Sequence, residues 1–226
     1  MTAILEAVLH NYRALTSYSD CGVVTVEIES IGKKFSGENK LLSGCLFATN
    51  FVRNANPPAK EPNLFRYQFT STGHFAELKE DNLSFICSNH EGVFKRSAED
   101  GLEPCPSLAV AVADTAAPSF AGSYYIASLL MAGIVSDKQW FFNRLSAIEI
   151  IDDENSGDCE NSEYASQHVH LRGQIKDGQV DLFIDKERFV FSQIIVARPT
   201  STARFVWQDL ALNGEINTRI FDQYRF

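Results

Sequence analysis

Two histidines, His168 and His170, lie two positions apart in a segment that alternates like a strand, so both imidazoles point to one face. This arrangement could supply two ligands to a metal ion, but a stable site needs at least a third ligand. The sequence places no third ligand at a recognisable spacing. We therefore interpret the histidines as a solvated or half-buried pair and predict no metal site.

Ser119 and Ser123 flank Gly122 beside an apolar segment, where a serine could act as a nucleophile. Helix caps and turns are the more common use of serine in such positions, and we interpret both residues in that way. The chain also lacks the GxSxG, HExxH, GxGxxG and P-loop patterns. We expect a protein that is not an enzyme and that uses no cofactor.

The acidic segment Asp152–Glu163 (DDENSGDCENSE) has the spacing of a calcium-binding loop, with oxygen-bearing side chains at its first, third, fifth, ninth and twelfth positions and Gly157 at the sixth. Such a loop normally joins two helices, whereas IEII before it and SQHVHL after it are typical of strands. We favour a solvated hairpin loop here, and a weak calcium site is the alternative.

Aromatic side chains offer a different chemistry, which is the binding of apolar molecules. The chain contains 17 Phe against 2 Met and 2 Trp, an enrichment typical of broad sheet faces. The clearest alternation in the sequence, at residues 64–70, places Phe65, Tyr67 and Phe69 on one face and polar side chains on the other. This segment predicts a strand with one aromatic face.

The elements around this strand must position its aromatic face. Apolar residues at helical spacing predict a helix at 2–16, and a polar break at 17–22 precedes a strand that begins near Val24. Further strands are predicted at 41–53, 83–87 and 93–96, the last two as a hairpin. Ser107 as a cap and Pro118 beyond the end predict a helix at 107–117, followed by helical segments at 123–132 and 137–143. Strands then return at 145–151, 164–172, 179–184, 188–197, 204–211 and 216–226.

Bulk properties limit the classes of function. A length of 226 residues favours one domain, 1–226, and a net charge of -9 without basic clusters argues against nucleic-acid binding. The five cysteines form no CxxC pair, which argues against a disulfide framework. The first thirty residues show no signal peptide, and the longest apolar stretch, 124–135, is too short to span a bilayer.

Short motifs of the chain resemble the outer-membrane lipoprotein carrier superfamily and allied uncharacterised predicted periplasmic proteins. They are Arg53, the run Pro62-Asn63-Leu64-Phe65-Arg66-Tyr67, the turn Glu91-Gly92 and the ending Tyr224-Arg225-Phe226. The resemblance implies an α+β fold, in which an incompletely closed antiparallel β-barrel carries an N-terminal helix and a helical lid insert at about 107–143. In the carriers the matching arginine helps to hold the lid closed, although here Asn54 replaces the proline that follows it.

We therefore expect a non-catalytic binding or carrier protein for a lipid or the acyl chain of a lipoprotein. The expected binding residues are Phe47, Arg53, Phe65, Tyr67, Phe69, Tyr124, Leu129, Leu130 and Trp140. One alternative is a protein-interaction or envelope-sensor module that uses the concave sheet face, and another is that these residues pack on each other as a dry core.

The same reasoning gives expectations for partners and compartment. We expect a monomer with transient membrane-protein partners and no nucleic-acid partner. The compartment is the periplasm or cell envelope if the resemblance holds and the chain is a mature form, and otherwise the cytoplasm.

Overall fold

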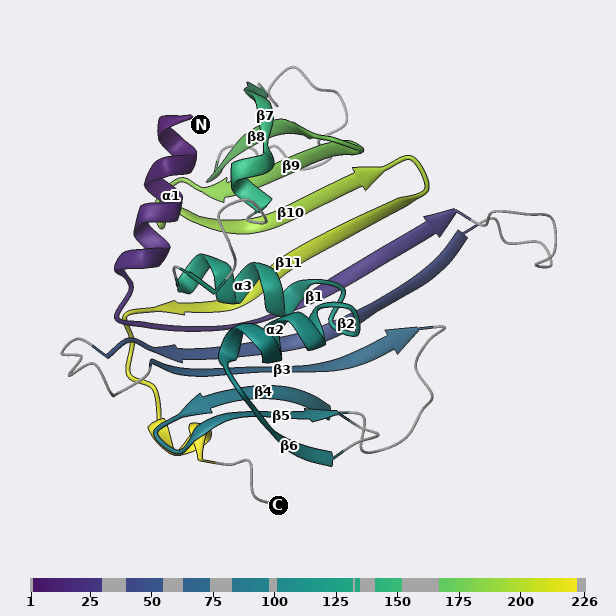
Figure 1. Ribbon diagram of the computed structural model, residues 1–226. Coiled ribbons are helices and arrows are strands. Elements are labelled where there is room, and N and C mark those ends of the chain that lie inside the picture. Colours follow the sequence, from purple (N-terminus) through teal and green to yellow (C-terminus); the bar gives the residue numbers. More distant parts are fainter. Residues whose placement is uncertain are drawn as a thin grey trace.

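Figure 1 shows the computed structural model of the chain, in which helices lie against one broad sheet. The structure describes residues 2–29, 40–54, 63–73, 83–97, 101–131, 133–134, 141–151 and 167–222. Some residues singled out by the sequence lie outside these ranges, among them Pro62, Trp140, the acidic loop Asp152–Glu163 and the ending Tyr224-Arg225-Phe226. Within the described ranges, no helix has both the length and the apolar character needed to cross a membrane.

The described strands form one antiparallel sheet of 11 strands in the order β6-β5-β4-β3-β2-β1-β11-β10-β9-β8-β7. Their bounds are β1 Ser17–Glu29, β2 Lys40–Val52, β3 Leu64–Gly73, β4 Leu83–Asn89, β5 Gly92–Ser97, β6 Gly101–Cys105, β7 Ser146–Ile151, β8 His168–Ile175, β9 Gly178–Asp185, β10 Val190–Arg198 and β11 Ser201–Leu212. Strands that follow each other along the chain pair, except β6 and β7, and at the centre of the sheet β1 also pairs with β11.

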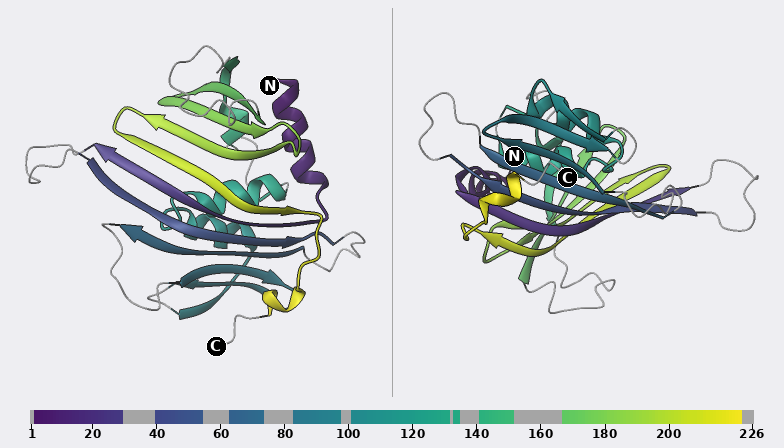
Figure 2. Two further views of the ribbon diagram at one scale, coloured as in Figure 1. Left: turned by 180° about the vertical axis from the view of Figure 1, so that it is seen from behind. Right: turned by 90° about the horizontal axis from the view of Figure 1, so that it is seen from below.

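The sheet is curved but not closed, because β6 and β7 form its two edges. Figure 2 shows the strands bending around the face that carries the short helices α2 (Leu108–Ala116) and α3 (Gly122–Leu130). Helix α1 (Ala3–Ala14) lies beside β10 and α3, at one end of the strands. The predicted fold class, an α+β half-barrel with an N-terminal helix and a helical insert, is confirmed.

The start of the first strand was predicted wrongly. The segment 17–22 is not a polar break, because β1 begins at Ser17 and pairs with β2 from Ser17↔Val52 onward. Hydrogen bonding to a strand on each side outweighs the polar local composition, since strand formation depends on context more than on propensity. As a consequence Tyr18 and Asp20 are buried on the same face as Val24.

The strand predicted at 216–226 is also wrong. The described part of this segment holds a short 3-10 helix, η3 (Thr218–Phe221), which Asn217 caps by accepting a hydrogen bond from the Arg219 N–H. Phe221 is buried against Phe85 and Cys87 on the outer face of β4, and its carbonyl oxygen accepts hydrogen bonds from the side chains of Cys87 and Asn89. Strand β6, which the sequence did not predict, extends the same side of the sheet.

The inner face of the sheet and the three α-helices share the main hydrophobic core. Helix α1 contributes four buried residues, Leu5, Val8, Leu9 and Tyr12. The Tyr12 hydroxyl oxygen accepts a hydrogen bond of 3.1 Å from the Phe191 backbone N–H, which ties α1 to β10. The amphipathic helix predicted at 2–16 is therefore confirmed, and the surface it covers is the end of the sheet.

The predicted helices of the insert are also present. Ser107 caps α2 by accepting a hydrogen bond from the Val110 N–H. The hydroxyl of Ser119, in the turn before α3, lies 3.0 Å from the hydroxyl of Ser123 in the first turn of α3, and both are buried. Two residues of this turn, Phe120 and Ala121, have left-handed backbone angles of φ 51° and 67°, which side chains adopt at a cost. Of the helical segment predicted at 137–143, the described part is a 3-10 helix, η1 (Phe141–Arg144).

Gly22 sits at the centre of the inner face, with the Phe47 ring lying across it. A Cβ atom at this position would lie 2.5 Å from the ring carbon Cζ of Phe47 and 2.3 Å from the Val206 carbonyl oxygen. The absence of a side chain on β1 therefore lets an aromatic ring from β2 cover the neighbouring strand.

We expect Gly22→Ala to lower the free energy of unfolding by about 1–3 kcal/mol, because the new methyl group overpacks this contact. Equilibrium unfolding in urea measures the change. Gly214→Ala is the matched control, since a Cβ there meets no atom within 4 Å. Equal midpoints for both variants and the parent protein would contradict the packing described for Gly22.

Candidate ligand-binding site

The four sheet residues predicted to line the site lie on one face. Phe47 pairs with Phe69 across β2 and β3, while Phe65 and Tyr67 alternate with Arg66 and share the orientation of Phe69. All four side chains are at most 4% exposed. The structure therefore brings Phe47, Phe65, Tyr67 and Phe69 together beneath the helical insert.

The residues predicted from the insert are placed less uniformly. Leu129 and Leu130 are buried in the same core as the sheet residues. Tyr124 is half-buried, and its ring meets the Tyr125 ring edge-on with centroids 5.6 Å apart. Tyr125, which the sequence prediction missed, packs edge-on against Phe205 of β11 at 5.0 Å. The insert thus packs on the sheet through the predicted Leu129 and Leu130 and also through Tyr125, which was not predicted.

A run of aromatic rings crosses the inner face from α1 to β3. Its successive centroid separations are 5.9 Å from Tyr12 to Phe191, 6.4 Å to Trp207, 6.5 Å to Phe47 and 5.9 Å to Tyr67. The sequence prediction missed Trp207 and Phe191. Alternation along 190–198 and 201–212 could have placed both side chains on the inner face, but not beside Phe47.

Arg53, at the end of β2, connects three parts of the molecule. Its Nε donates a hydrogen bond to the Leu15 carbonyl oxygen at 2.8 Å, and its Nη2 donates to the Leu130 carbonyl oxygen at the same distance. The guanidinium also lies 5.0 Å from the centre of the Phe51 ring. Arg53 therefore holds the end of α3 against the end of α1 and the sheet.

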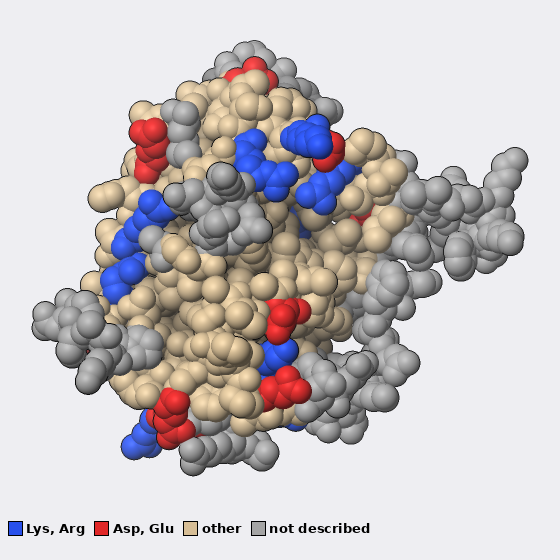
Figure 3. All heavy atoms as spheres, in the orientation of Figure 1, with Lys and Arg blue, Asp and Glu red and all other residues tan. Residues whose placement is uncertain are grey.

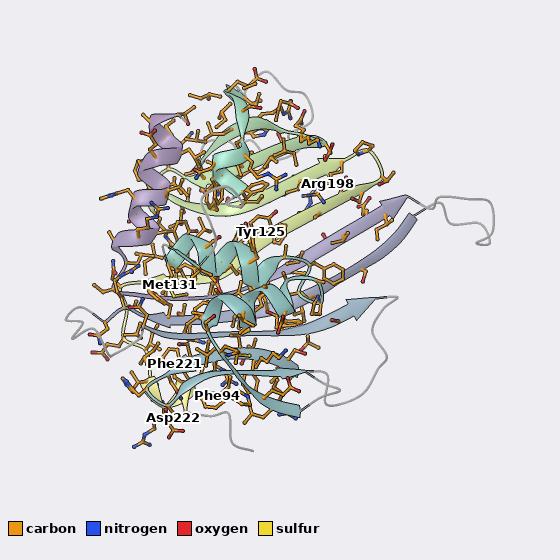
Figure 4. All side chains as sticks on the ribbon, in the orientation of Figure 1. Phe94, Tyr125, Met131, Arg198, Phe221 and Asp222 are labelled. Atoms are coloured by element: carbon orange, nitrogen blue, oxygen red, sulfur yellow. The ribbon has the colours of Figure 1, made fainter. Side chains whose placement is uncertain are left out.

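The outer surface of the insert carries little charge. Figure 3 shows few Lys, Arg, Asp or Glu atoms near the centre of the face that bears α2 and α3. Tyr125 lies on the side of α3 toward Arg198, the last residue of β10 (Figure 4). Burial raises the pKa of Tyr125 to about 12, although the positive charge of Arg198 acts in the opposite direction.

The inner face also contains a buried carboxyl group that the sequence prediction missed. Asp20 is 5% exposed, and one of its oxygens accepts a hydrogen bond of 2.5 Å from the Tyr18 hydroxyl. Burial raises the pKa of Asp20 to about 6, while the Tyr18 hydrogen bond lowers it in part. Extending the alternation of Val24 back by four residues could have found Asp20.

The histidine pair lies on the outer face of the sheet. His170 is buried, its Nε2 lies 2.8 Å from an oxygen of Asp181, and its ring stacks on Phe183. Burial alone would raise the pKa of Asp181, but hydrogen bonds with His170 and Arg172 bring it below the ordinary value. In the part of the chain that the structure describes, no cluster of three His, Cys, Asp or Glu side chains is placed to hold a metal ion.

No family model matches the sequence, and a search among curated proteins finds no match. Solved structures do match. They include MucB bound to MucA from Pseudomonas aeruginosa (8% identity, 96% of this chain, 59% of that chain, TM-score 0.42) and LprF from Mycobacterium bovis (9%, 95%, 93%, 0.45). A domain from Vibrio parahaemolyticus named for outer-membrane lipoprotein sorting also matches (7%, 97%, 95%, 0.39).

This chain thus spans about three fifths of the MucB structure, at 59%. The structures named here share 7 to 9% identity with this chain, and the family resemblance of the sequence motifs stays a prediction.

The buried Asp20 carboxyl should make stability depend on pH. Its pKa is about 6 in the folded chain against 3.8 as the ordinary value, so between these pH values the folded state holds the proton more firmly. The contribution of Asp20 to stability is therefore present at low pH and is lost as pH rises through 6.

We expect Asp20→Asn to gain stability over the parent protein as pH rises, by about 2 kcal/mol between pH 4 and pH 7.5. Urea unfolding at several pH values measures the difference. Asp177→Asn, at the exposed turn between β8 and β9, controls for the loss of one negative charge. A constant difference between Asp20→Asn and the parent would show that Asp20 is not buried as described.

Proposed function

We propose that this protein binds an apolar molecule, such as a lipid or the acyl chain of a lipoprotein, between the inner sheet face and the helices α2 and α3, without catalysing a reaction. The observation that carries the proposal is the aromatic face of β2 and β3, which two helices of nine residues each cover. The proposed binding residues are the four sheet aromatics with Tyr124, Leu129, Leu130 and Trp140, and with Arg53 at the edge.

A ligand reaches this face when the insert moves, since the helices bury the aromatic rings. Two features support such movement. Helices shorter than about 12 residues are marginal on their own, and the turn before α3 holds two left-handed residues. In this proposal the insert moves and the sheet, whose strands are joined by continuous backbone pairing, stays in place.

The energetics of the proposal follow from burial. An opened insert exposes aromatic surface to water, and each methylene group of a bound chain regains about 0.8 kcal/mol. A chain that replaces the helices on the sheet offsets the cost of opening in this way. The binding therefore depends on length and apolar character more than on any single hydrogen bond.

Bound lipid is the direct test of this function. Protein purified without detergent and extracted with organic solvent should release about one lipid per chain in mass spectrometry. Phe69→Gln, which places an amide on the inner face, should reduce that amount severalfold because a buried amide without a partner is costly. Leu46→Gln is the matched control, since Leu46 faces outward and is 56% exposed. A parent protein that is free of lipid and takes up none from vesicles would contradict the proposal.

The role of Arg53 gives a second test. Arg53→Met removes the hydrogen bonds to the carbonyl oxygens of Leu15 and Leu130, which should loosen α3 and speed the release of a bound fluorescent lipid about tenfold. Stopped-flow dilution measures the release rate. Arg204→Met, at an exposed position of β11, should release the probe at the parent rate. Equal rates for both variants would remove Arg53 from the mechanism.

A further inference from the structure

Four buried polar atoms on the inner face have no hydrogen-bond partner among the described residues. They are one carboxylate oxygen of Asp20, the Thr49 hydroxyl oxygen, the Tyr67 hydroxyl oxygen and the Trp207 indole nitrogen. Their side chains are at most 8% exposed. Buried polar groups are paired in the large majority of cases, so four unpaired atoms on one face need an explanation.

These four side chains lie on four adjacent strands. Asp20 of β1 pairs with Thr49 of β2, and Thr49 pairs with Tyr67 of β3, so the three form one row across the sheet. Trp207 of β11 pairs with Gly22, two residues along β1 from Asp20. We call these four residues the polar row.

Electrostatic effects also bring the polar row together. Burial raises the pKa of Tyr67 most, Cys45 and then Asp20 raise it further, and hydrogen bonding with Ser119 lowers it. Thr49 and Trp207 lie near enough to Asp20 to lower its pKa, yet neither the Thr49 oxygen nor the Trp207 nitrogen reaches hydrogen-bond geometry. The polar atoms of Asp20, Thr49 and Trp207 therefore lie close together, and the Tyr67 hydroxyl lies further along the same face, next to Gly122 at the start of α3.

Packing alone does not account for the polar row. The rings beside it are aromatic, with Phe47 between Tyr67 and Trp207, and Val at position 49 or Phe at positions 67 and 207 would fill similar volumes without a polar atom. Each unpaired buried group weakens the fold. A polar group from another molecule would supply the missing hydrogen bonds.

The chemistry of the row defines that group. Tyr67 and Trp207 can donate a hydrogen bond, ionised Asp20 can only accept one, and Thr49 can do either. A matching group must therefore both accept and donate, as a hydroxyl or a primary amide does.

An anionic group fits the row poorly because Asp20 repels it. The buried cation Arg66 lies on the opposite face, where it stacks on Phe85, and Arg53 donates to the carbonyl oxygens of Leu15 and Leu130. Neither side chain offers a counter-charge beside Asp20.

We propose that the polar row is the head-group end of the ligand site, and that it selects apolar molecules with an uncharged hydroxyl or amide head. This inference rests on the proposed function and adds the class of ligand. The head reaches the row when α3 lifts, because Gly122 at the start of α3 lies directly over the Tyr67 hydroxyl.

Ligands of equal chain length test this selection. Dodecan-1-ol offers a donor and an acceptor, dodecyl methyl ether offers only an acceptor, and dodecanoate carries a charge. Displacement of N-phenyl-1-naphthylamine from the full chain gives the three affinities. We expect the alcohol to bind about tenfold more tightly than the ether, as one hydrogen bond to a charged group provides, and dodecanoate to bind no better than the ether.

Variants of the row should remove the preference and leave chain binding intact. In Thr49→Val and Trp207→Phe the ratio of ether to alcohol dissociation constants should fall to about threefold or less. Thr70→Val, the same change on the outer face of β3, should keep the parent ratio. The indole N–H resonance of Trp207, identified by its loss in Trp207→Phe, should shift with the alcohol and not with the ether.

The possible failures are distinguishable. Equal affinity for alcohol and ether in the parent protein would mean that the row holds only trapped water, which overturns the head-group assignment and leaves the proposed function standing. Tightest binding of dodecanoate would overturn it as well. If none of the three compounds displaces the probe, both the proposed function and this inference fail. The comparison within the parent protein stays decisive even if a variant does not fold.

Discussion

The pairing of β1 with β11 is the interaction on which the rest of the structure depends. Strand β1 pairs along its whole length with β2, and from Tyr18 to Ile28 it also pairs with β11, the last strand among the described residues. Strands 2–6 and strands 7–11 otherwise form separate antiparallel series. This one seam joins them into a curved face wide enough to seat both α2 and α3.

The same seam explains the position of the buried polar groups. Asp20 lies between the end of β11 and β2, where backbone pairing on both sides fixes the direction of its side chain toward the insert. A register change of one residue would turn the carboxylate outward to water. The sheet therefore imposes the burial of a carboxyl group of which the Tyr18 hydroxyl satisfies one oxygen, and the cost of the other oxygen is local to the proposed site.

The two faces of the sheet are closed in different ways. On the outer face, Phe221 and its carbonyl oxygen are fixed by Phe85, Cys87 and Asn89 through direct side-chain hydrogen bonds and packing. On the inner face, the insert is held by apolar contact, by Arg53 at one end and by a close approach at Gly122. Apolar contact lacks direction, so a bound molecule can replace it without leaving unpaired groups, and the insert is the cover suited to exchange.

The sequence alone determined those helices and strands in which apolar residues recur at a regular spacing. The helical spacing of 2–16, the Ser107 cap and the alternation of Phe65, Tyr67 and Phe69 each reflect which side of an element meets the core, and such patterns need no distant partner. Together with the family resemblance they gave the half-barrel and the four aromatic residues of β2 and β3.

Only the tertiary structure decided that β1 starts at Ser17, that 216–222 packs as a turn and η3 on the outer face, and that Trp207 meets Phe47. Each of these three features depends on contacts and register between segments far apart in the sequence, which a local sequence pattern does not indicate. Asp20 and Thr49 belong to the proposed site for the same reason, since their common position exists only once β1, β2 and β11 are paired.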